Sequence, residues 1–297
     1  SSTCYCMFAC LADHQTGQPL ARGNEMIRQR NLWITVLLLW SLAPLLWQLY
    51  TSFCTHEALL QPLAEHNQRW TLDNYRQVLT ANPPFWRYLL NSVIVGISST
   101  GLTLLIAIPA AYSLSRVSQN IARTAKLILL GAALFPYVLL FLALLELARS
   151  FNLGNNLLAL SFPYAGLSMP LAVLLLLSAF RDLPSELEEA ARLEGFDLWQ
   201  RLRWVLIPLI GPATASTAIL VFLFSWNEYP IALTWIRRAD LLTLPVAIAR
   251  IAGSSVYSIP YGAYAAATVL GALPLLLLVL IFQRQIVSGL TQGAIKG

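Results

Sequence analysis

The sequence predicts an all-α, polytopic integral membrane protein with six transmembrane helices, and three observations lead to this prediction. Of the 297 residues 57% are hydrophobic and only 11% are charged, whereas a soluble domain carries roughly 25% charged residues. The mean hydropathy is +0.64. Six apolar stretches approach or exceed the roughly 20 residues that a helix needs to cross a bilayer. The positive residues gather near the ends of these stretches, which favours membrane orientation over nucleic-acid binding as the reason for the net charge of +5.

The predicted spans lie near residues 32–53, 88–114, 124–148, 157–180, 205–235 and 262–283. Pro44 and Pro109 fall inside the first two spans, where neighbouring groups can satisfy the freed carbonyls. The polar segment 54–87 separates these two spans. Within it, the spacing of apolar residues over 72–79 predicts a short amphipathic helix along the membrane surface, capped by Thr71.

The distribution of Lys and Arg predicts the orientation of the chain. Twelve of the 19 basic residues flank one predicted side and seven flank the other, which places both termini and residues 181–204 in the cytoplasm. We divide the chain into an N-terminal cytoplasmic tail, residues 1–30, and a transmembrane domain, residues 31–297. Residues 1–25 are interpreted as a disordered or non-native extension.

The first residues contain three cysteines and a histidine that could be read as a metal cluster. Cys4, Cys6, Cys10 and His14 match no common zinc spacing, so we predict no metal site. The chain has only two lysines, Lys126 and Lys296. Neither lies in the Gly-rich context of a phosphate-binding loop, so any ATP hydrolysis must come from a partner.

Residues 183–208 form the densest run of charge in this apolar chain. Ser185 and Glu188 have the spacing of a capping box, and Gly195 is placed to stop the helix that follows. Asp197 and Gln200 repeat the capping pattern, and a second helix is predicted to run towards Pro208. The segment therefore predicts two helices joined at a glycine elbow, with small and apolar residues on one face of the first helix. A solvated amphipathic helix at the membrane surface is the alternative.

This segment resembles the EAA coupling loop of binding-protein-dependent ABC importer permeases. The resemblance rests on Glu189, Ala190, Ala191, Gly195 and Pro208; Val205 and Ile207 depart mildly from the Ile-x-Leu-Pro ending of the family. Much of the chain also resembles the smaller permease subunit of carbohydrate importers of the maltose and trehalose type. The matching stretches are residues 71–75 (TLDNY), 91–92 (NS), 110–116 (AAYSLSR), 224–228 (FSWNE), 243–248 (TLPVAI) and 289–297 (GLTQGAIKG).

The resemblance implies an ABC importer transmembrane domain of type I in the bacterial inner membrane, with residues 183–207 as its coupling loop. It also implies a second homologous permease, two ATPase subunits that bind ATP and Mg²⁺, and an extracytoplasmic sugar-binding protein. The expected substrate is a disaccharide, such as trehalose or maltose, a small oligosaccharide or a related osmolyte. Residues 253–255 (GSS) and the C-terminal tail resemble trehalose-type permeases in particular.

Charged residues inside spans need an explanation because they are costly to bury in lipid. Glu146 is interpreted as an interfacial partner of Arg149. Trp226, Asn227, Glu228 and Tyr229 offer a ring, an amide, a carboxylate and a hydroxyl, which are groups that bind sugars, so they are candidates for lining the substrate path. Alternatively, Asn227 and Glu228 form hydrogen bonds with neighbouring helices.

Two other classes of protein are less consistent with the sequence. A self-sufficient secondary transporter needs ionisable groups within the membrane for ion coupling, and this chain is nearly bare of them. A membrane-embedded enzyme needs a catalytic cluster, and the sequence shows none, so no catalytic residue is predicted. An importer of glycerol phosphate or a polyol is an alternative within the resembling family.

Overall fold

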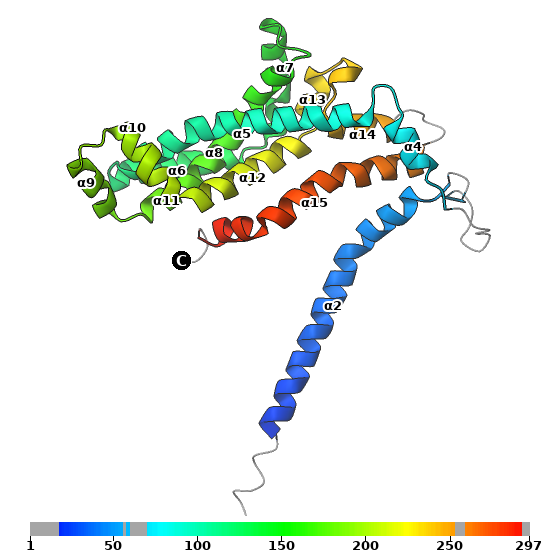
Figure 1. Ribbon diagram of the computed structural model, residues 1–297, viewed down its shortest axis with the longest axis horizontal. Helices are drawn as coiled ribbons and strands as arrows, with labels where there is room; N and C mark the ends of the chain where they lie inside the picture. The colour runs from blue at the N-terminus through cyan, green and yellow to red at the C-terminus, as the bar shows by residue number, and fades with distance from the viewer. Residues whose placement is uncertain (1–17, 56–57, 60–69, 253–258, 293–297) are drawn as a thin grey trace, which may run out of the picture. The chain divides into compact units, whose positions relative to one another are not determined.

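The computed structural model describes residues 18–55, 58–59, 70–252 and 259–292, and within these ranges the chain is almost entirely helical (Figure 1). The cysteine-rich start, residues 253–255 and the last five residues lie outside the described residues. Residues 1–51 and 52–297 form two separate units and are described separately.

The first unit contains the long helix α2, Gln18–Ser52, with Pro44 inside it. Its segment Asn31–Ser52 is long and apolar enough to cross a membrane, as expected from the sequence. The helix begins before residue 31, so helical structure extends back into the segment that we had assigned to the N-terminal tail.

The second unit is built around α5, Phe85–Ser115, which packs against α8, Leu157–Arg181, and α12, Gly211–Asn227. Hydroxyl pairs join these helices at short distances: Ser98 to Ser161 at 2.5 Å and Ser99 to Ser225 at 2.7 Å. Such interhelical hydrogen bonds and small residues let helices approach closely in a membrane, where burial from water gives no driving force. Helix α6, Gln119–Leu134, packs on α8, and α15, Tyr261–Gln292, packs on α12.

Two predicted spans are bent in the structure. Four single helices have the length and composition of a span, and two bent pairs raise this number to as many as six within the described ranges. The predicted span 124–148 is broken near Phe135 and Pro136, where α6 and the segment Tyr137–Ser150 meet at 78°. That segment comprises a 3₁₀ turn, η2 (Tyr137–Leu140), and α7 (Phe141–Ser150). Proline cannot continue the hydrogen-bond ladder of a helix, which accounts for this break.

The predicted span 205–235 needs a larger correction. Helix α12 occupies only Gly211–Asn227, and a separate helix, α13 (Pro230–Trp235), follows it. On the other side of α12, the segment Leu198–Leu209 meets it at 82°. Residues 205–209 therefore belong to the preceding loop rather than to the span.

The short helix after the first span is present as α4, Asp73–Leu79. The predicted cap at Thr71 was wrong: Leu72 is the N-cap and its side chain makes no capping bond, although the Thr71 hydroxyl accepts a hydrogen bond from the Asp73 amide at 3.0 Å. Figure 1 shows α4 and α14, Leu244–Ala252, at one end of α5, whereas the helices of the 183–208 segment lie at the other end.

Candidate functional site

The 183–208 segment forms the predicted pair of helices joined by a glycine elbow. Helix α9, Ser185–Leu193, ends at Gly195, whose φ is +86°. The Phe196 amide donates to the Ala191 carbonyl and the Gly195 amide to the Arg192 carbonyl, both at 3.1 Å. These two bonds make a Schellman ending, in which a residue without a Cβ adopts the left-handed conformation at low cost. The elbow is therefore held by its own backbone.

Only one of the two predicted capping boxes is present. Asp197 and Gln200 form the second one, with Gln200 N donating to Asp197 Oδ1 at 2.7 Å and Asp197 N donating to Gln200 Oε1 at 2.9 Å. The first prediction was wrong: Pro184 occupies the N-cap of α9 and no side chain caps it. Ser185 is already helical, and Glu188 makes other contacts, described below.

The second helix of the elbow is anchored in the bundle. It comprises α10 (Leu198–Gln200), a stretch of π-helix, η3 (Arg201–Leu206), and α11 (Ile207–Leu209). Leu202 and Leu206 are buried in a core that also contains Leu176 and Phe180 of α8. Because α9 packs against η3, the elbow is carried on an element that belongs to the transmembrane core.

The predicted coupling residues differ in their exposure. Glu189, Ala190 and Pro208 are exposed, whereas Ala191 is only 5% exposed and packs inward. The two alanines therefore do not share one open face, although the sequence placed them together. Ala190 is the small residue that remains available to another protein.

Large apolar side chains are also exposed on this segment. Leu193 is 90% exposed and Trp204 is 67% exposed. The other exposed members of this set are Leu187, Leu198 and Trp199. A cluster of exposed apolar side chains beside charged residues is typical of a surface that binds protein or lipid.

Sequence reasoning missed the role of Glu188. Its Oε1 accepts hydrogen bonds from the Tyr112 hydroxyl and from Arg201 Nη1, the latter at 3.4 Å. Its Oε2 forms an ion pair with Arg116 Nε at 2.8 Å. Tyr112 and Arg116 lie in the AAYSLSR stretch that carried part of the family resemblance, but the spacing of residues along the chain contains no signal that this stretch meets residue 188.

Of the four path candidates, Glu228 has an internal role. It is 3% exposed and accepts a hydrogen bond from the Tyr164 hydroxyl at 2.5 Å. It also accepts from the amides of Ile231 at 2.9 Å and Ala232 at 3.1 Å, at the start of α13. These contacts match the alternative that the sequence left open, in which the carboxylate bonds to neighbouring helices.

The other three candidates line a groove of about 380 Å³ between α12, α14 and α15. Asn227 is exposed there, Tyr229 is half-buried and Trp226 is mostly buried. Tyr264 and Thr268 of α15 add two hydroxyl groups to the same groove. This set combines ring surfaces with an amide and hydroxyls, which are the groups needed to contact a sugar.

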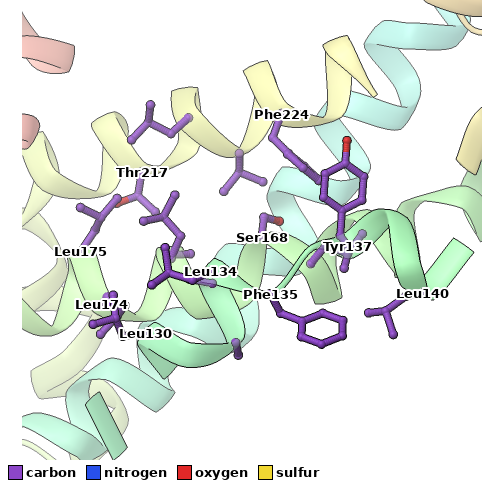
Figure 2. Close-up of a pocket in the computed structure, with 17 residues that line it drawn as sticks. Leu130, Leu134, Phe135, Tyr137, Leu140, Ser168, Leu174, Leu175, Thr217 and Phe224 are labelled. Carbon is purple, nitrogen blue, oxygen red and sulfur yellow. The ribbon is translucent and has the colours of Figure 1, made fainter. Parts of the chain in front are cut away.

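A second cavity, of about 340 Å³, lies among α6, α8 and α12 (Figure 2). Most of its lining is aliphatic or aromatic, and its hydroxyl groups come from Tyr137, Ser168 and Thr217. Figure 2 shows Thr217 towards one end, Tyr137 towards the other and Ser168 between them. Ser168 already donates to the Tyr164 carbonyl at 2.6 Å, so this cavity offers few free polar groups to a hydroxylated ligand.

Two residues of α5, Asn91 and Ser92, hold α14 beside the groove. The Asn91 amide donates to the carbonyls of Asp240 at 3.1 Å and Leu242 at 2.9 Å, and the Ser92 hydroxyl accepts from the Leu244 amide at 2.8 Å. Arg238 also binds the Asp240 carboxylate, through Nε at 3.1 Å and Nη2 at 2.7 Å. This hydrogen bonding lowers the pKa of Asp240 and keeps it ionised.

The expected ion pair of Glu146 with Arg149 is absent from the described part of the chain.

Glu228→Ala is expected to destabilise the protein rather than to change only its substrate preference. The substitution leaves a buried hydroxyl and two amides without an acceptor, at a cost of roughly 3 kcal/mol. The measurement is the thermal midpoint of the purified, membrane-extracted protein. Glu228→Gln keeps one acceptor oxygen and should lose less.

Asn227→Ala is the matched control for this prediction. Its amide is exposed and bonds only to the Leu223 carbonyl of its own helix, at 2.8 Å. The thermal midpoint should therefore stay near that of the wild type. If Glu228→Ala has the thermal midpoint of the wild type and changes only transport, Glu228 is again a candidate for lining the substrate path.

The fold and the elbow define an integral membrane protein of the transporter class, with a helix–glycine–helix segment at one end of its spans. The chain belongs to the family of binding-protein-dependent transport system inner membrane components. The sequence model of this family matches residues 72–292. The members of this family that it resembles are transport permease subunits rather than enzymes.

Curated relatives cover most of the chain. The sulfoquinovosyl glycerol transport system permease protein SmoH of Agrobacterium fabrum is 36% identical over 89% of this chain and 92% of the relative. The trehalose transport system permease protein SugB of Mycobacterium tuberculosis is 38% identical over 76% of this chain and 82% of the relative. The trehalose/maltose transport system permease protein MalG of Thermococcus litoralis is 38% identical over 86% of this chain and 92% of the relative.

A solved structure has the same fold. It is a bacterial ABC transporter involved in the import of the acidic polysaccharide alginate, with a TM-score of 0.74 and 21% identity. The likeness covers 89% of this chain and 97% of that chain. The expected fold class, an ABC importer transmembrane domain, is confirmed.

Proposed function

We propose that this chain is one permease subunit of an ABC importer for a sugar, forms half of the translocation path and couples it to a separate ATPase. The observation that carries the coupling role is the elbow: its first helix exposes Ala190 and Glu189, and its second helix buries Leu202 and Leu206 in the bundle. A partner that binds the first helix can therefore move the transmembrane core through the second.

The partner at the elbow is an ATPase subunit. A small residue such as Ala190 allows the helix to approach a groove closely, and Glu189 can pair with a basic group there. The exposed Leu193 and Trp204 add apolar area to the same interface. ATP and Mg²⁺ belong to two such ATPase subunits, and this chain supplies no cofactor site and no bond chemistry.

The complete transporter contains a second homologous permease, which forms the other half of the path, and an extracytoplasmic sugar-binding protein. We place the complex in the bacterial inner membrane, with the elbow and both termini in the cytoplasm. The excess of Lys and Arg on that side supports this orientation.

The substrate class is a disaccharide, a small oligosaccharide or a related osmolyte. Relatives named for trehalose, maltose and sulfoquinovosyl glycerol support this class. The groove that contains Trp226, Asn227 and Tyr229 offers stacking and hydrogen-bonding groups to such a molecule. Glycerol phosphate remains the alternative substrate to test.

The test is reconstitution of the permease pair, the ATPase and the binding protein in proteoliposomes. We expect one member of a panel of trehalose, maltose, sulfoquinovosyl glycerol, diacetylchitobiose and glycerol phosphate to stimulate both ATP hydrolysis and uptake by at least tenfold. Asn227→Ala should change the apparent affinity for that substrate. Uptake that follows an ion gradient in the absence of ATP would instead indicate a secondary transporter.

A further inference from the structure

Glu188 connects the elbow to a helix that is not its neighbour in the chain. Helix α9 leads covalently to α8 through residues 182–184, and the second elbow helix leads to α12 through the bend at Ile210. Helix α5 has no covalent link to the elbow, because it continues into α6. The polar contacts of Glu188 with Tyr112 and Arg116 link the elbow to α5, in addition to the apolar core that the two share.

The contacts of Glu188 are stronger than those of an ordinary surface ion pair. The side chain of Glu188 is 15% exposed, that of Arg201 is 12% exposed and that of Arg116 is 31% exposed. Both carboxylate oxygens are used: Oε1 accepts hydrogen bonds from Tyr112 and Arg201, and Oε2 forms an ion pair with Arg116. Charge-assisted hydrogen bonds between partly buried groups are shorter and stronger than those between neutral groups, and solvent screens them less.

The cluster extends from α5 into the transmembrane core. Tyr112 lies in the last turn of α5, and Arg116 is the C-cap residue that directly follows this helix. The Arg116 guanidinium lies 5.7 Å from the centre of the Tyr112 ring, and that ring packs edge-on against Phe180 of α8 at 5.7 Å. Through these contacts Glu188 reaches the two helices that form the centre of the bundle.

We infer that Glu188 is a positioning residue that fastens the elbow to the cytoplasmic end of α5, so that elbow, α5 and α8 move as one body. The source of the movement rests on the proposed function, in which an ATPase displaces the elbow. In this role Glu188 acts through contacts within its own chain. It determines how much of the displacement reaches α5.

The first test measures whether the elbow and α5 move together, independently of transport. Spin labels are placed at the exposed Arg192 and Ser113, with the four native cysteines replaced, in the assembled complex. With Glu188 intact, the distance distribution should be narrow and the same with and without ATP. Glu188→Gln keeps the shape of the side chain but removes its charge, and should broaden the distribution or shift it on addition of ATP.

Glu186→Gln is the matched control, because Glu186 is an exposed carboxylate on the same helix and forms no ion pair among the described residues. The label distances in this variant should match those of the wild type. If Glu188→Gln gives the wild-type distribution in both states, Glu188 does not fasten the elbow and the inference is wrong, even where the wild-type complex imports sugar.

The second test measures the coupling ratio, the number of sugar molecules taken up per ATP hydrolysed. Glu188→Gln should lower this ratio at least fivefold while the ATPase still co-purifies, and Tyr112→Phe, which loses one hydrogen bond, should lower it less. Glu188→Arg should lower the coupling ratio more than Glu188→Gln does.

A purely structural role would lower assembly and thermal stability without changing the ratio, and that result would overturn the inference. Failure of the proposed function gives a different result, because the wild-type complex would then show no ATP-dependent uptake.

Discussion

Ala190→Trp is expected to abolish uptake, by at least 50-fold, while the protein still inserts in the membrane. Ala190 is exposed on α9, so a larger side chain can be accommodated without disturbing the internal packing of this chain. It would, however, fill the space that a groove on the ATPase needs for close approach. We expect either loss of the ATPase on purification or ATP hydrolysis that sugar no longer stimulates.

Arg192→Trp is the matched control for this experiment. The residue is also exposed on α9, but two positions along a helix turn by about 200°, so its side chain points nearly opposite to that of Ala190. The same large ring at position 192 should leave most of the uptake. Uptake and sugar-stimulated ATP hydrolysis in proteoliposomes measure both variants.

A substitution at Ala191 distinguishes a loss of docking from a loss of folding. Its side chain is only 5% exposed, so Ala191→Trp should disrupt the packing of α9 and lower the yield of folded protein, as overpacking does. Ala190→Trp should not. Normal uptake and normal sugar-stimulated hydrolysis in a folded Ala190→Trp complex would mean that this helix does not dock, and the coupling role would lose its main support.

Gly195→Pro should also abolish uptake, through the backbone rather than through a contact. Gly195 has a φ of +86°, whereas the proline ring holds φ near −65°. The substitution also removes the Gly195 amide, which donates to the Arg192 carbonyl at 3.1 Å. The chain must therefore leave α9 in another direction, and the exposed face of the helix no longer points at its partner.

Gly195→Ala isolates the conformational part of this effect. A Cβ at this position would meet no atom within 4 Å, so the cost comes only from the left-handed backbone and is roughly 1 kcal/mol. We expect partial uptake. Gly211→Ala is the control, because a Cβ there also meets nothing within 4 Å and its φ is not in the left-handed range. Full uptake by Gly195→Pro would show that the direction of the elbow does not matter.

The local features of the elbow could be predicted because they depend on residues close together in the chain. The stop at Gly195 and the cap formed by Asp197 and Gln200 involve partners no more than five residues away. The family relationship, which rested on several motifs along the chain, is confirmed by the match over residues 72–292. The assignment of residues to coupling and to the substrate path stays a prediction.

Hydropathy was sufficient for four of the spans but not for the two bent ones. The breaks near Pro136 and at Ile210 lie inside apolar stretches, and an average over about 20 residues gives the same value for a straight and a bent helix. The proline at 136 was a visible signal. However, prolines at 44, 109 and 274 lie inside continuous helices, so proline alone does not decide where a span breaks.

The sequence by itself determined the class of the protein, the family and the existence of two helices joined at a glycine, because composition and short-range spacing are properties of the chain. Only the tertiary structure decided what the two acidic residues do. Glu188 meets Tyr112, 76 residues away, and Glu228 meets Tyr164, 64 residues away. A carboxylate buried near a membrane bundle must find donors, and which donors it finds depends on how the helices pack.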